Sequence, residues 1–361
     1  MKLKTTTHSA LRSIGPTLRQ AILVSLCLVL AGCSQGVPQS GSEPPRPAID
    51  PAPSESGGAP AENGATRFPL EVTDGLGRTV KVAKIPRRIV SLSPKNTEML
   101  FAIGAGDQTV GTTTYCNYPP AASKTEKVGG FSAKSLSLER IVGVQPDLVV
   151  SVGDLHVPII EELERLNIPV VAFAADSFAG LYADLQLLGQ ITGHEAETEK
   201  LVQTLIARVN RVKDTANNIP ASARVTAMYY VWGEPLTGAG PNSYFGEMIQ
   251  FCGAINIIEE TSTRFHKITM EVLLARNPDV IISSTNHSDL VSMENVESRP
   301  GWNRLKAVQT QRVHLLEGSL VSRCTPRTVD ALELMAHAIY PDYFAAPHAE
   351  HASIPASGQQ P

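Results

Sequence analysis

The sequence predicts an α/β protein with two lobes, a long helical bridge between them and a ligand cleft where the lobes meet. Along most of the chain, short apolar stretches alternate with segments whose apolar residues recur at helical spacing. That alternation is typical of a parallel sheet covered by helices. Residues 177–217 interrupt it, because they keep the helical spacing without any strand pattern. The chain has 361 residues, 42% hydrophobic and 18% charged, which suits about two globular domains once the ends are set aside.

The N-terminus has the features of an export signal. Basic residues precede an apolar run at residues 21–30, which is shorter than the roughly 20 residues that span a bilayer. The run leads into LAGC at residues 30–33, a small-residue site before a cysteine that resembles the lipobox of bacterial lipoproteins. We predict a signal peptide over residues 1–32 and lipidation of Cys33, with an ordinary secretory signal as the alternative. Several acyl chains on Cys33 would anchor the protein to a membrane of the cell envelope, facing the periplasm or the exterior.

Both ends of the mature chain have a composition that cannot form a core. Residues 33–67 are rich in proline, glycine, serine and alanine, which predicts a flexible tether, and residues 345–361 predict a similar disordered tail. The formal net charge is −4, and no basic stripe with interleaved aromatic residues is present. This composition argues against a nucleic-acid partner.

The N-terminal lobe is expected at residues 68–176. Its start alternates apolar and polar residues around Asp74-Gly75, which predicts a hairpin. A strand at RRIVSLSP then precedes a helix over residues 96–103, which Gly104 follows. The further predicted elements are strands at QTVGTTTY, DLVVSVG and IPVVAF and helices at LSLERIVGVQ and HVPIIEELERLN.

The bridge and the C-terminal lobe follow. Residues 177–217 are predicted to form a bridging helix, or two helices if Gly193 breaks the segment. The C-terminal lobe is expected at residues 218–344, where the alternation resumes. Its predicted strands are RVTAMYYVW, DVIISST and RVHLL, and its predicted helices lie near residues 244–252, 270–275, 302–307 and 325–340.

Five cysteines are present, of which Cys27 leaves with the signal and Cys33 is the lipidation candidate. Cys116, Cys252 and Cys324 remain in an exported protein, where a disulfide is chemically favoured. Three is an odd number, so at most one internal disulfide can form, and the spacing matches no zinc site. We interpret the three as structural residues.

Several motifs in one order resemble the periplasmic cobalamin-binding proteins and their ferric-siderophore-binding and haem-binding relatives. They are SPKNTE at residues 93–98, the stretch from Val110-Gly111 to Tyr118-Pro119-Pro120, LERIVGVQPDLVV, EVLLARNPDVII and SRCTPRTVDALELMAHAI. The resemblance covers residues 68–344. It implies two Rossmann-like lobes joined by a long rigid helix. It also implies the substrate-binding component of an ABC importer, with a permease and its ATPase subunits as partners.

The resemblance also points to candidate ligand-binding residues. Tyr115 holds an aromatic cleft position of the cobalamin binders, Phe131 lies near where they carry a tryptophan, and Trp232 and Phe265 fall in cleft-lining segments. Arg323 matches an arginine that contacts the ligand. Flat aromatic rings suit the face of a corrin or porphyrin, and arginine donates well to amides or carboxylates.

The sequence departs from the cobalamin binders at Ser319, around Cys324 and at Ala336. Ser319 replaces their aspartate, and Ala336 stands where the family's second lobe-two cysteine would be. The predicted ligand is cobalamin or a related corrinoid, with a ferric siderophore or haem as the alternative. This metal chelate would be cargo, so no cofactor, no protein metal site and no catalytic residue is predicted.

Two glutamates are candidates for permease docking. Glu139 in LSLERI and Glu271 in TMEVLLA occupy matching places in the two lobes. In the family that this chain resembles, such a pair meets arginines on the two permease subunits. The alternative is that each is a solvated glutamate favoured by the dipole of its helix.

Other classes of protein fit the sequence less well. An exported hydrolase would need a nucleophile elbow, a zinc-protease motif or a phosphate loop, and the sequence contains none of these. A zinc or manganese receptor needs three or four converging ligands, whereas His156, His266, His287 and His314 are scattered. His266, near the predicted cleft, is a candidate axial ligand for haem or cobalt. The two-lobe pattern argues against a pure scaffold.

Overall fold

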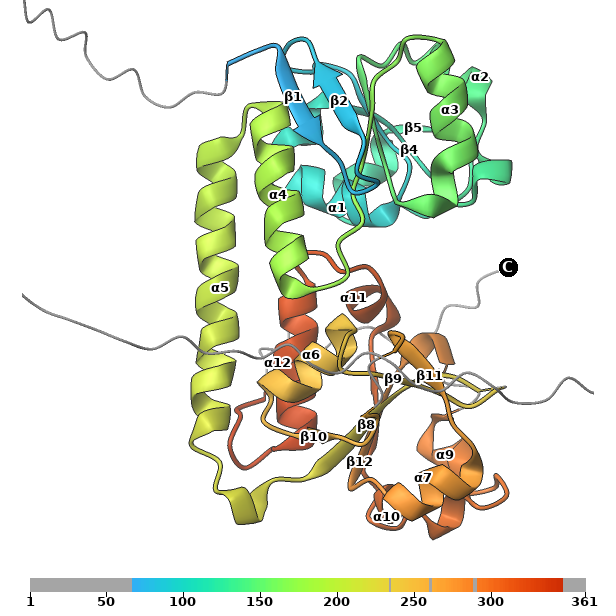
Figure 1. Cartoon of the computed structure of the whole chain (residues 1–361), viewed down its shortest axis with the longest axis vertical. Helices are drawn as coiled ribbons and strands as arrows, with labels where there is room; N and C mark the ends of the chain where they lie inside the picture. Colours follow the sequence, from blue (N-terminus) through green and yellow to red (C-terminus); the bar gives the residue numbers. More distant parts are fainter. Residues whose placement is uncertain (1–66, 234, 260–261, 288–290, 347–361) are drawn as a thin grey trace, which may run out of the picture. The chain divides into compact units, whose positions relative to one another are not determined.

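The computed structural model describes residues 67–346 apart from 234, 260–261 and 288–290 (Figure 1). The described residues fall within one compact unit, which contains both lobes. The predicted signal peptide, with the lipidation candidate Cys33 and most of the tether and of the tail, lies outside the described residues. None of the helices within the described ranges is both long and apolar enough to cross a bilayer.

The N-terminal lobe begins with the expected hairpin, β1 (Leu70–Thr73) and β2 (Thr79–Val82), which pair antiparallel. Its main sheet has the order β5-β4-β3-β6-β7 and is parallel throughout. Helices cover the sheet on both faces, so the central strands are buried and read as continuous apolar runs. The elements are β3 (Ile89–Ser91), α1 (Pro94–Ala102), β4 (Thr109–Thr112), β5 (Glu126–Lys127), α2 (Leu138–Gly143), β6 (Leu148–Ser151), α3 (Val157–Arg165) and β7 (Val170–Ala172).

Helix α1 shows how local sequence fixes an element of this lobe. The Ser93 hydroxyl accepts a hydrogen bond from the Asn96 backbone N–H, and Pro94 occupies the first turn, where a missing N–H costs nothing. Gly104, at a φ of 93°, has the left-handed backbone that follows many helix ends. These signals place residues 93–98 directly behind the C-terminal end of β3.

The bridge consists of two helices rather than one. Helix α4 (Phe178–Thr192) ends at Gly193, whose φ of 77° breaks the helical path, and α5 (Glu195–Asn217) follows. The two helices lie side by side (Figure 1). Within this bridge, α4 contacts α1 of the N-terminal lobe, and α5 contacts α4 as well as α6 and α12 of the C-terminal lobe. Arg208 of α5 binds Asp330 and Glu333 of α12 at 2.6 and 2.7 Å, which fixes the bridge to the second lobe.

The C-terminal lobe repeats the parallel core and adds an antiparallel edge. Strands β8 (Thr226–Trp232), β12 (Val280–Ser284) and β13 (Val313–Leu316) are parallel, as is β10 (Ile255–Asn256) along the start of β8. Strands β9 (Thr237–Ala239) and β11 (Phe265–Lys267) extend the sheet antiparallel. The helices are α6 (Tyr244–Phe251), α7 (Met270–Arg276), α9 (Met293–Val296), α10 (Lys306–Gln309), α11 (Gly318–Ser322) and α12 (Thr328–Ile339).

The predicted fold class is confirmed, with differences in detail. Residues 302–307, expected as one helix, form a 3-10 turn over Trp302–Arg304 followed by the short α10. The last predicted helix is preceded by the separate α11, because Cys324 has a φ of 47° that interrupts the helical path. Among the described residues, Cys116, Cys252 and Cys324 are buried free thiols.

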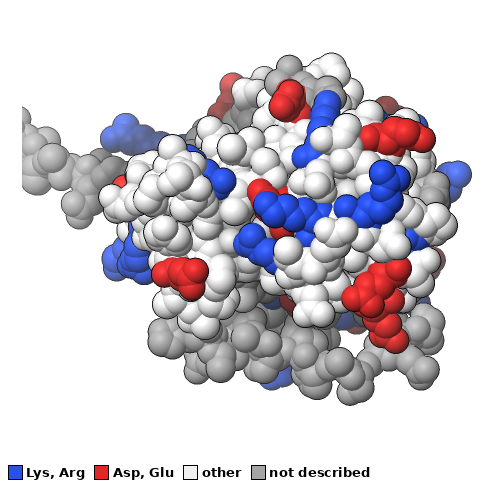
Figure 2. All heavy atoms as spheres, turned by 90° about the horizontal axis from the view of Figure 1, so that it is seen from below, with Lys and Arg blue, Asp and Glu red and all other residues white. Residues whose placement is uncertain are grey.

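Lysine and arginine side chains gather on the lower face of the C-terminal lobe (Figure 2). Several basic residues of this lobe have structural partners. Arg312 donates to the Ile339 carbonyl at the end of α12, Arg276 donates to the Ile257 carbonyl, and Lys306 pairs with Asp279 at 2.5 Å. Basic groups near helix C-termini stabilise the unpaired carbonyls there.

Candidate ligand-binding cleft

A cleft of about 830 Å³ lies between the two lobes. Its N-terminal wall comes from the segments that follow β3, β4, β5, β6 and β7, at the edge of a parallel sheet where ligands usually bind. Its C-terminal wall comes from the start of α6 and the end of α11. The lining residues are Ser93, Pro94, Lys95, Tyr115, Phe131, Ser132, Ser135, Val152, Ala175, Asp176, Tyr244, Ser322, Arg323 and Cys324.

Tyr115 is held at the cleft by a buried turn. The Cys116 N–H donates to the Thr113 carbonyl, and the Cys116 thiol lies 3.1 Å from the Thr97 hydroxyl and 3.2 Å from the Thr113 hydroxyl. Cys116 and both threonines are buried, whereas the Tyr115 side chain is 59% exposed. The turn therefore fixes the backbone and leaves the ring available to a ligand.

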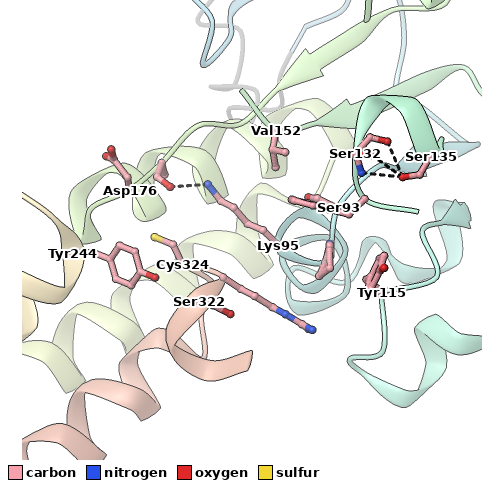
Figure 3. A pocket seen from close by; sticks show the side chains of 14 residues that line it. Ser93, Lys95, Tyr115, Ser132, Ser135, Val152, Asp176, Tyr244, Ser322 and Cys324 are labelled. Atoms are coloured by element: carbon pink, nitrogen blue, oxygen red, sulfur yellow. Dashed lines mark hydrogen bonds between the residues drawn. The ribbon is translucent and has the colours of Figure 1, made fainter. Parts of the chain in front are cut away.

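Phe131 is presented by a second tight loop. Gly129 has a φ of 130°, and a Cβ there would lie 2.4 Å from the Ser135 carbonyl oxygen, so the close approach requires glycine. Ser132 and Ser135 close the loop through reciprocal hydrogen bonds (Figure 3). The Phe131 ring is 39% exposed and meets the imidazole of His156 edge-on, with 5.8 Å between ring centroids.

His156 supports two backbone groups of the cleft wall. Its Nδ1 lies 3.4 Å from the Val152 N–H, which donates to it, and its Nε2 lies 2.7 Å from the Phe131 carbonyl oxygen. A neutral imidazole with its proton on Nε2 satisfies both contacts. Burial lowers the pKa of His156, although the hydrogen bond to Phe131 opposes that shift. Protonation would remove the acceptor that Val152 uses.

We expect the free energy of unfolding to decrease as the pH falls, because His156 is harder to protonate in the folded protein. Its pKa is lower in the folded state than in the unfolded state, so below the unfolded value of about 6.5 the unfolded chain binds more protons. The stabilisation is complete above that pH and is lost as the pH falls through the folded pKa. Thermal unfolding between pH 5 and 8 should therefore depend less on pH in His156→Gln than in the wild type.

The matched control for this prediction is His194→Gln, at the half-buried start of α5. This variant removes a different imidazole, so comparing the two variants separates the contribution of His156 from the general effect of losing a histidine. If the thermal midpoint of His156→Gln depends on pH as strongly as that of the wild type, His156 does not cause the loss of stability at low pH.

The C-terminal wall carries an aromatic ring and a thiol. Tyr244 is only 9% exposed, and its hydroxyl donates to the Val321 carbonyl. Cys324 is 5% exposed, and burial raises its pKa to about 12. Its thiol lies 3.9 Å from the Ser177 carbonyl oxygen, at the point where the lobes meet. Both residues therefore belong to the packing between the lobes.

The charged groups along the cleft form ion pairs. Lys95 binds Asp184 at 2.9 Å and donates to the Ala175 carbonyl at 3.0 Å (Figure 3). Asp176 pairs with Arg264 across the lobes. Arg323 donates to Glu98 Oε1 at 2.7 Å and to Asn117 Oδ1 at 3.0 Å.

The structure brings together three of the five predicted ligand residues, namely Tyr115, Phe131 and Arg323. Trp232 and Phe265 do not line the cleft, and they are 54% and 43% exposed. Phe265 is nevertheless connected to the C-terminal wall of the cleft through neighbouring aromatic rings. Its ring centroid is 6.3 Å from that of Phe245, which is 4.0 Å from that of Tyr244.

Sequence analysis missed Lys95, Asp176, Tyr244 and the four lining serines. The Ser-Pro pair at residues 93–94 was the available signal for Ser93 and Lys95, because it marks a helix start after a strand of a parallel sheet. Tyr244 gave no local signal, since its position follows an antiparallel edge strand. The sequence could therefore have pointed to Ser93 and Lys95 as cleft residues, but not to Tyr244.

Glu139 and Glu271 have equivalent surroundings in the two lobes. Each is the second residue of its helix, α2 or α7, behind a capping hydroxyl from Ser137 or Thr269. Both glutamates are exposed. A hydrogen bond with the Thr269 side chain, together with one from its own backbone N–H, lowers the pKa of Glu271, which is therefore ionised at neutral pH.

The segments that follow the two glutamates also match. Gln145 and Asn277 both have a positive φ before a Pro-Asp pair. Asp147 then accepts from the Arg88 N–H before β3, and Asp279 accepts from the Thr226 N–H at the start of β8. The repeated architecture places the two carboxylates at the same point of each lobe.

Metal coordination by the protein finds no support in the described ranges. No group of three or more histidine, cysteine, aspartate or glutamate side chains there could hold an ion. His266, the candidate axial ligand, is 9% exposed, and its Nε2 lies 2.6 Å from the Thr263 carbonyl oxygen. His266 is also outside the lining of the cleft.

A family model described as periplasmic binding protein matches residues 89–320. The chain belongs to this family. The match begins at β3 and ends in α11, so it includes both lobes and most of the cleft. The expected kinship with periplasmic binding proteins is thus confirmed.

Individual relatives of this periplasmic binding protein cover most of its length. A Bacillus subtilis (strain 168) protein described as an uncharacterized ABC transporter substrate-binding lipoprotein, YvrC, is 29% identical over 329 residues, 90% of this chain and 97% of the relative. A cobalamin-binding protein of Halobacterium salinarum (strain ATCC 29341 / DSM 671 / R1) is 27% identical over 281 residues, 76% of this chain and 75% of the relative.

A solved structure resembles the fold of this periplasmic binding protein. It comes from Staphylococcus epidermidis ATCC 12228 and is described as a possible iron-binding, periplasmic solute-binding protein. It has a TM-score of 0.65 and 26% sequence identity, and covers 71% of this chain and 100% of that chain.

Proposed function

We propose that this chain is the substrate-binding component of an ABC importer and captures cobalamin or a related corrinoid. It would deliver this ligand to a permease driven by ATPase subunits. The observation that carries the proposal is the cleft of about 830 Å³, which Tyr115, Phe131 and Tyr244 line from both lobes. The exposed rings of Tyr115 and Phe131 can bury the surface of a flat, rigid chelate at low entropic cost. The cobalamin-binding relative supports the choice of ligand.

Arg323 and the two outer aromatics complete the proposed site. The Arg323 guanidinium is held by Glu98 and Asn117, so it can donate to a ligand side arm without first being ordered. Trp232 and Phe265 are proposed to contact the part of a large ligand that extends beyond the cleft. The ring series through Phe245 supports this role for Phe265.

A ferric siderophore or haem is the second candidate ligand. The solved structure described as a possible iron-binding protein supports this alternative. Calorimetric titration of the purified mature protein with cyanocobalamin, cobinamide, haemin and a ferric hydroxamate separates the candidates. We expect a saturable heat with the corrinoids. Binding of haemin or the ferric hydroxamate without any corrinoid binding would replace the ligand and keep the transport function. Hydrolase activity without binding of any chelate would favour the remote alternative, an exported hydrolase.

We propose that Glu139 and Glu271 dock the protein to its permease. Their exposed carboxylates and equivalent helix positions would let each lobe meet a basic cluster on one subunit of a two-fold permease. Charge pairs at an interface guide association and fix its register, and contribute less to the stability of either partner.

We propose a lipid anchor on Cys33, with the folded body outside the cytoplasmic membrane. The LAGC sequence and the lipoprotein relative in Bacillus subtilis support this assignment. Cys33→Ala should remove lipidation, because it deletes the thiol that carries the acyl chain. Cell fractionation should then find soluble mature protein or unprocessed precursor. Ser34→Ala, next to the cleavage site, should still yield the lipidated protein. A Cys33→Ala protein that is both mature and membrane-bound would contradict the anchor.

A further inference from the structure

A buried carboxylate holds two arginines at the wall of the cleft. Glu98 of α1 is 3% exposed, and both arginines reach it from the other lobe. Arg327 binds it through two hydrogen bonds of 2.8 and 3.0 Å, and Arg323 binds it through one of 2.7 Å. The Arg327 guanidinium also lies over the Tyr118 ring, 3.8 Å from its centroid.

A second carboxylate lies close to the same cluster. Glu317 accepts hydrogen bonds from the Ser319 and Leu320 N–H groups of α11 and from the Ser319 hydroxyl. Arg327 lies 3.3 Å from that hydroxyl. Two guanidinium groups thus face two carboxylates, and the cluster is close to electrically neutral.

The other charged groups of the cleft are compensated in the same way. Lys95 is paired with Asp184, and Asp176 is paired with Arg264. The uncharged lining includes Ser93, Ser132, Ser135 and Ser322, whose hydroxyls also make hydrogen bonds within the protein. A hydroxyl both donates and accepts, so these groups match amide or hydroxyl arms of a ligand.

We infer that Glu98 sets the charge selectivity of the cleft, which accepts a chelate with uncharged, amide-type arms and discriminates against one with several carboxylates. The inference deepens the proposed function and depends on it. A carboxylate ligand would compete with Glu98 for Arg323 and would place its charge next to a buried carboxylate of the same sign. Repulsion between like charges is strong where water is excluded. An amide arm can use the free N–H groups of Arg323 and leave the ion pairs intact.

Two ligands with the same ring test this inference. Cobinamide carries amide side arms, whereas cobyrinic acid has carboxylates on the same corrin ring. Calorimetry with the wild-type protein should give at least about a hundredfold tighter binding of cobinamide, with little change between low and high salt. Tighter binding of cobyrinic acid would overturn the inference while the proposed import function stands. Failure of both corrinoids and of haemin to bind would overturn both.

Three variants that change the charge of the cluster test whether Glu98 causes the selectivity. Relative to the wild type, Glu98→Gln raises the charge of the cluster by one and Arg327→Gln lowers it by one, while the double variant restores it. The preference for cobinamide should narrow about tenfold or more in Glu98→Gln, widen in Arg327→Gln and return toward the wild-type value in the double variant. Binding of cobyrinic acid to Glu98→Gln should weaken as salt rises.

The series also separates selectivity from folding. Circular dichroism and the thermal midpoint identify any variant that loses the fold. If Glu98→Gln does not fold, the change in preference is measured with Arg327→Gln. An equal loss of both ligands in each folded variant, with an unchanged ratio between them, would show that Glu98 only holds the lobes together.

Discussion

Replacing Tyr115 with alanine is expected to weaken corrinoid binding by about 5- to 150-fold. The ring is 59% exposed at the cleft, so a ligand can stack on it without moving the protein. Stacking of a flat ring on an aromatic side chain is worth roughly 1–3 kcal/mol, by analogy with nucleic-acid bases. The turn that carries Tyr115 is held by Cys116 and Thr97, so the substitution should leave the fold intact.

Calorimetry of Tyr115→Ala, Phe131→Ala and the double variant measures this effect. The double variant should bind more weakly than either single variant, but its loss need not equal their sum, because both rings contact one ligand. Tyr343→Ala is the matched control, since it removes an aromatic ring that is 41% exposed and not part of the cleft. Unchanged corrinoid affinity in Tyr115→Ala would remove this residue from the proposed site.

The second large effect is expected on transport. The double variant Glu139→Ala/Glu271→Ala should abolish uptake of the ligand by cells, and each single variant should reduce it. Both carboxylates are exposed, and neither lines the cleft. Ligand affinity should therefore stay at the wild-type value in all three variants. Uptake of a labelled corrinoid is measured beside calorimetry of the purified proteins.

A matched control removes the same charge from the same lobes. Glu161 of α3 and Glu294 of α9 are exposed glutamates outside the starts of α2 and α7. The double variant Glu161→Ala/Glu294→Ala should transport normally. Normal uptake in Glu139→Ala/Glu271→Ala, or loss of ligand binding in either of its single variants, would contradict the docking role.

The sequence by itself determined those features that depend on neighbouring residues. The alternation of apolar stretches predicted both sheets, Ser93 and Gly104 marked the ends of α1, and Gly193 marked the break within the bridge. Local backbone preferences and short-range hydrogen bonds decide such features, so they can be read from a window of the chain. The pairing of Glu139 with Glu271 came instead from the matching places of LSLERI and TMEVLLA in the family that the chain resembles. The structure then added a capping hydroxyl before each glutamate.

Only the tertiary structure decided which side chains meet at the cleft. It brought Tyr115 and Phe131 to the lining and added Tyr244, while it left Trp232 and Phe265 outside. The ion pair between Glu98 and Arg323 joins residues 225 positions apart. Contacts of this kind depend on how two lobes pack around a bridge, and no local pattern in the chain encodes that geometry. The charge balance of the cleft, and with it the expected choice of ligand, is therefore a property of the folded protein.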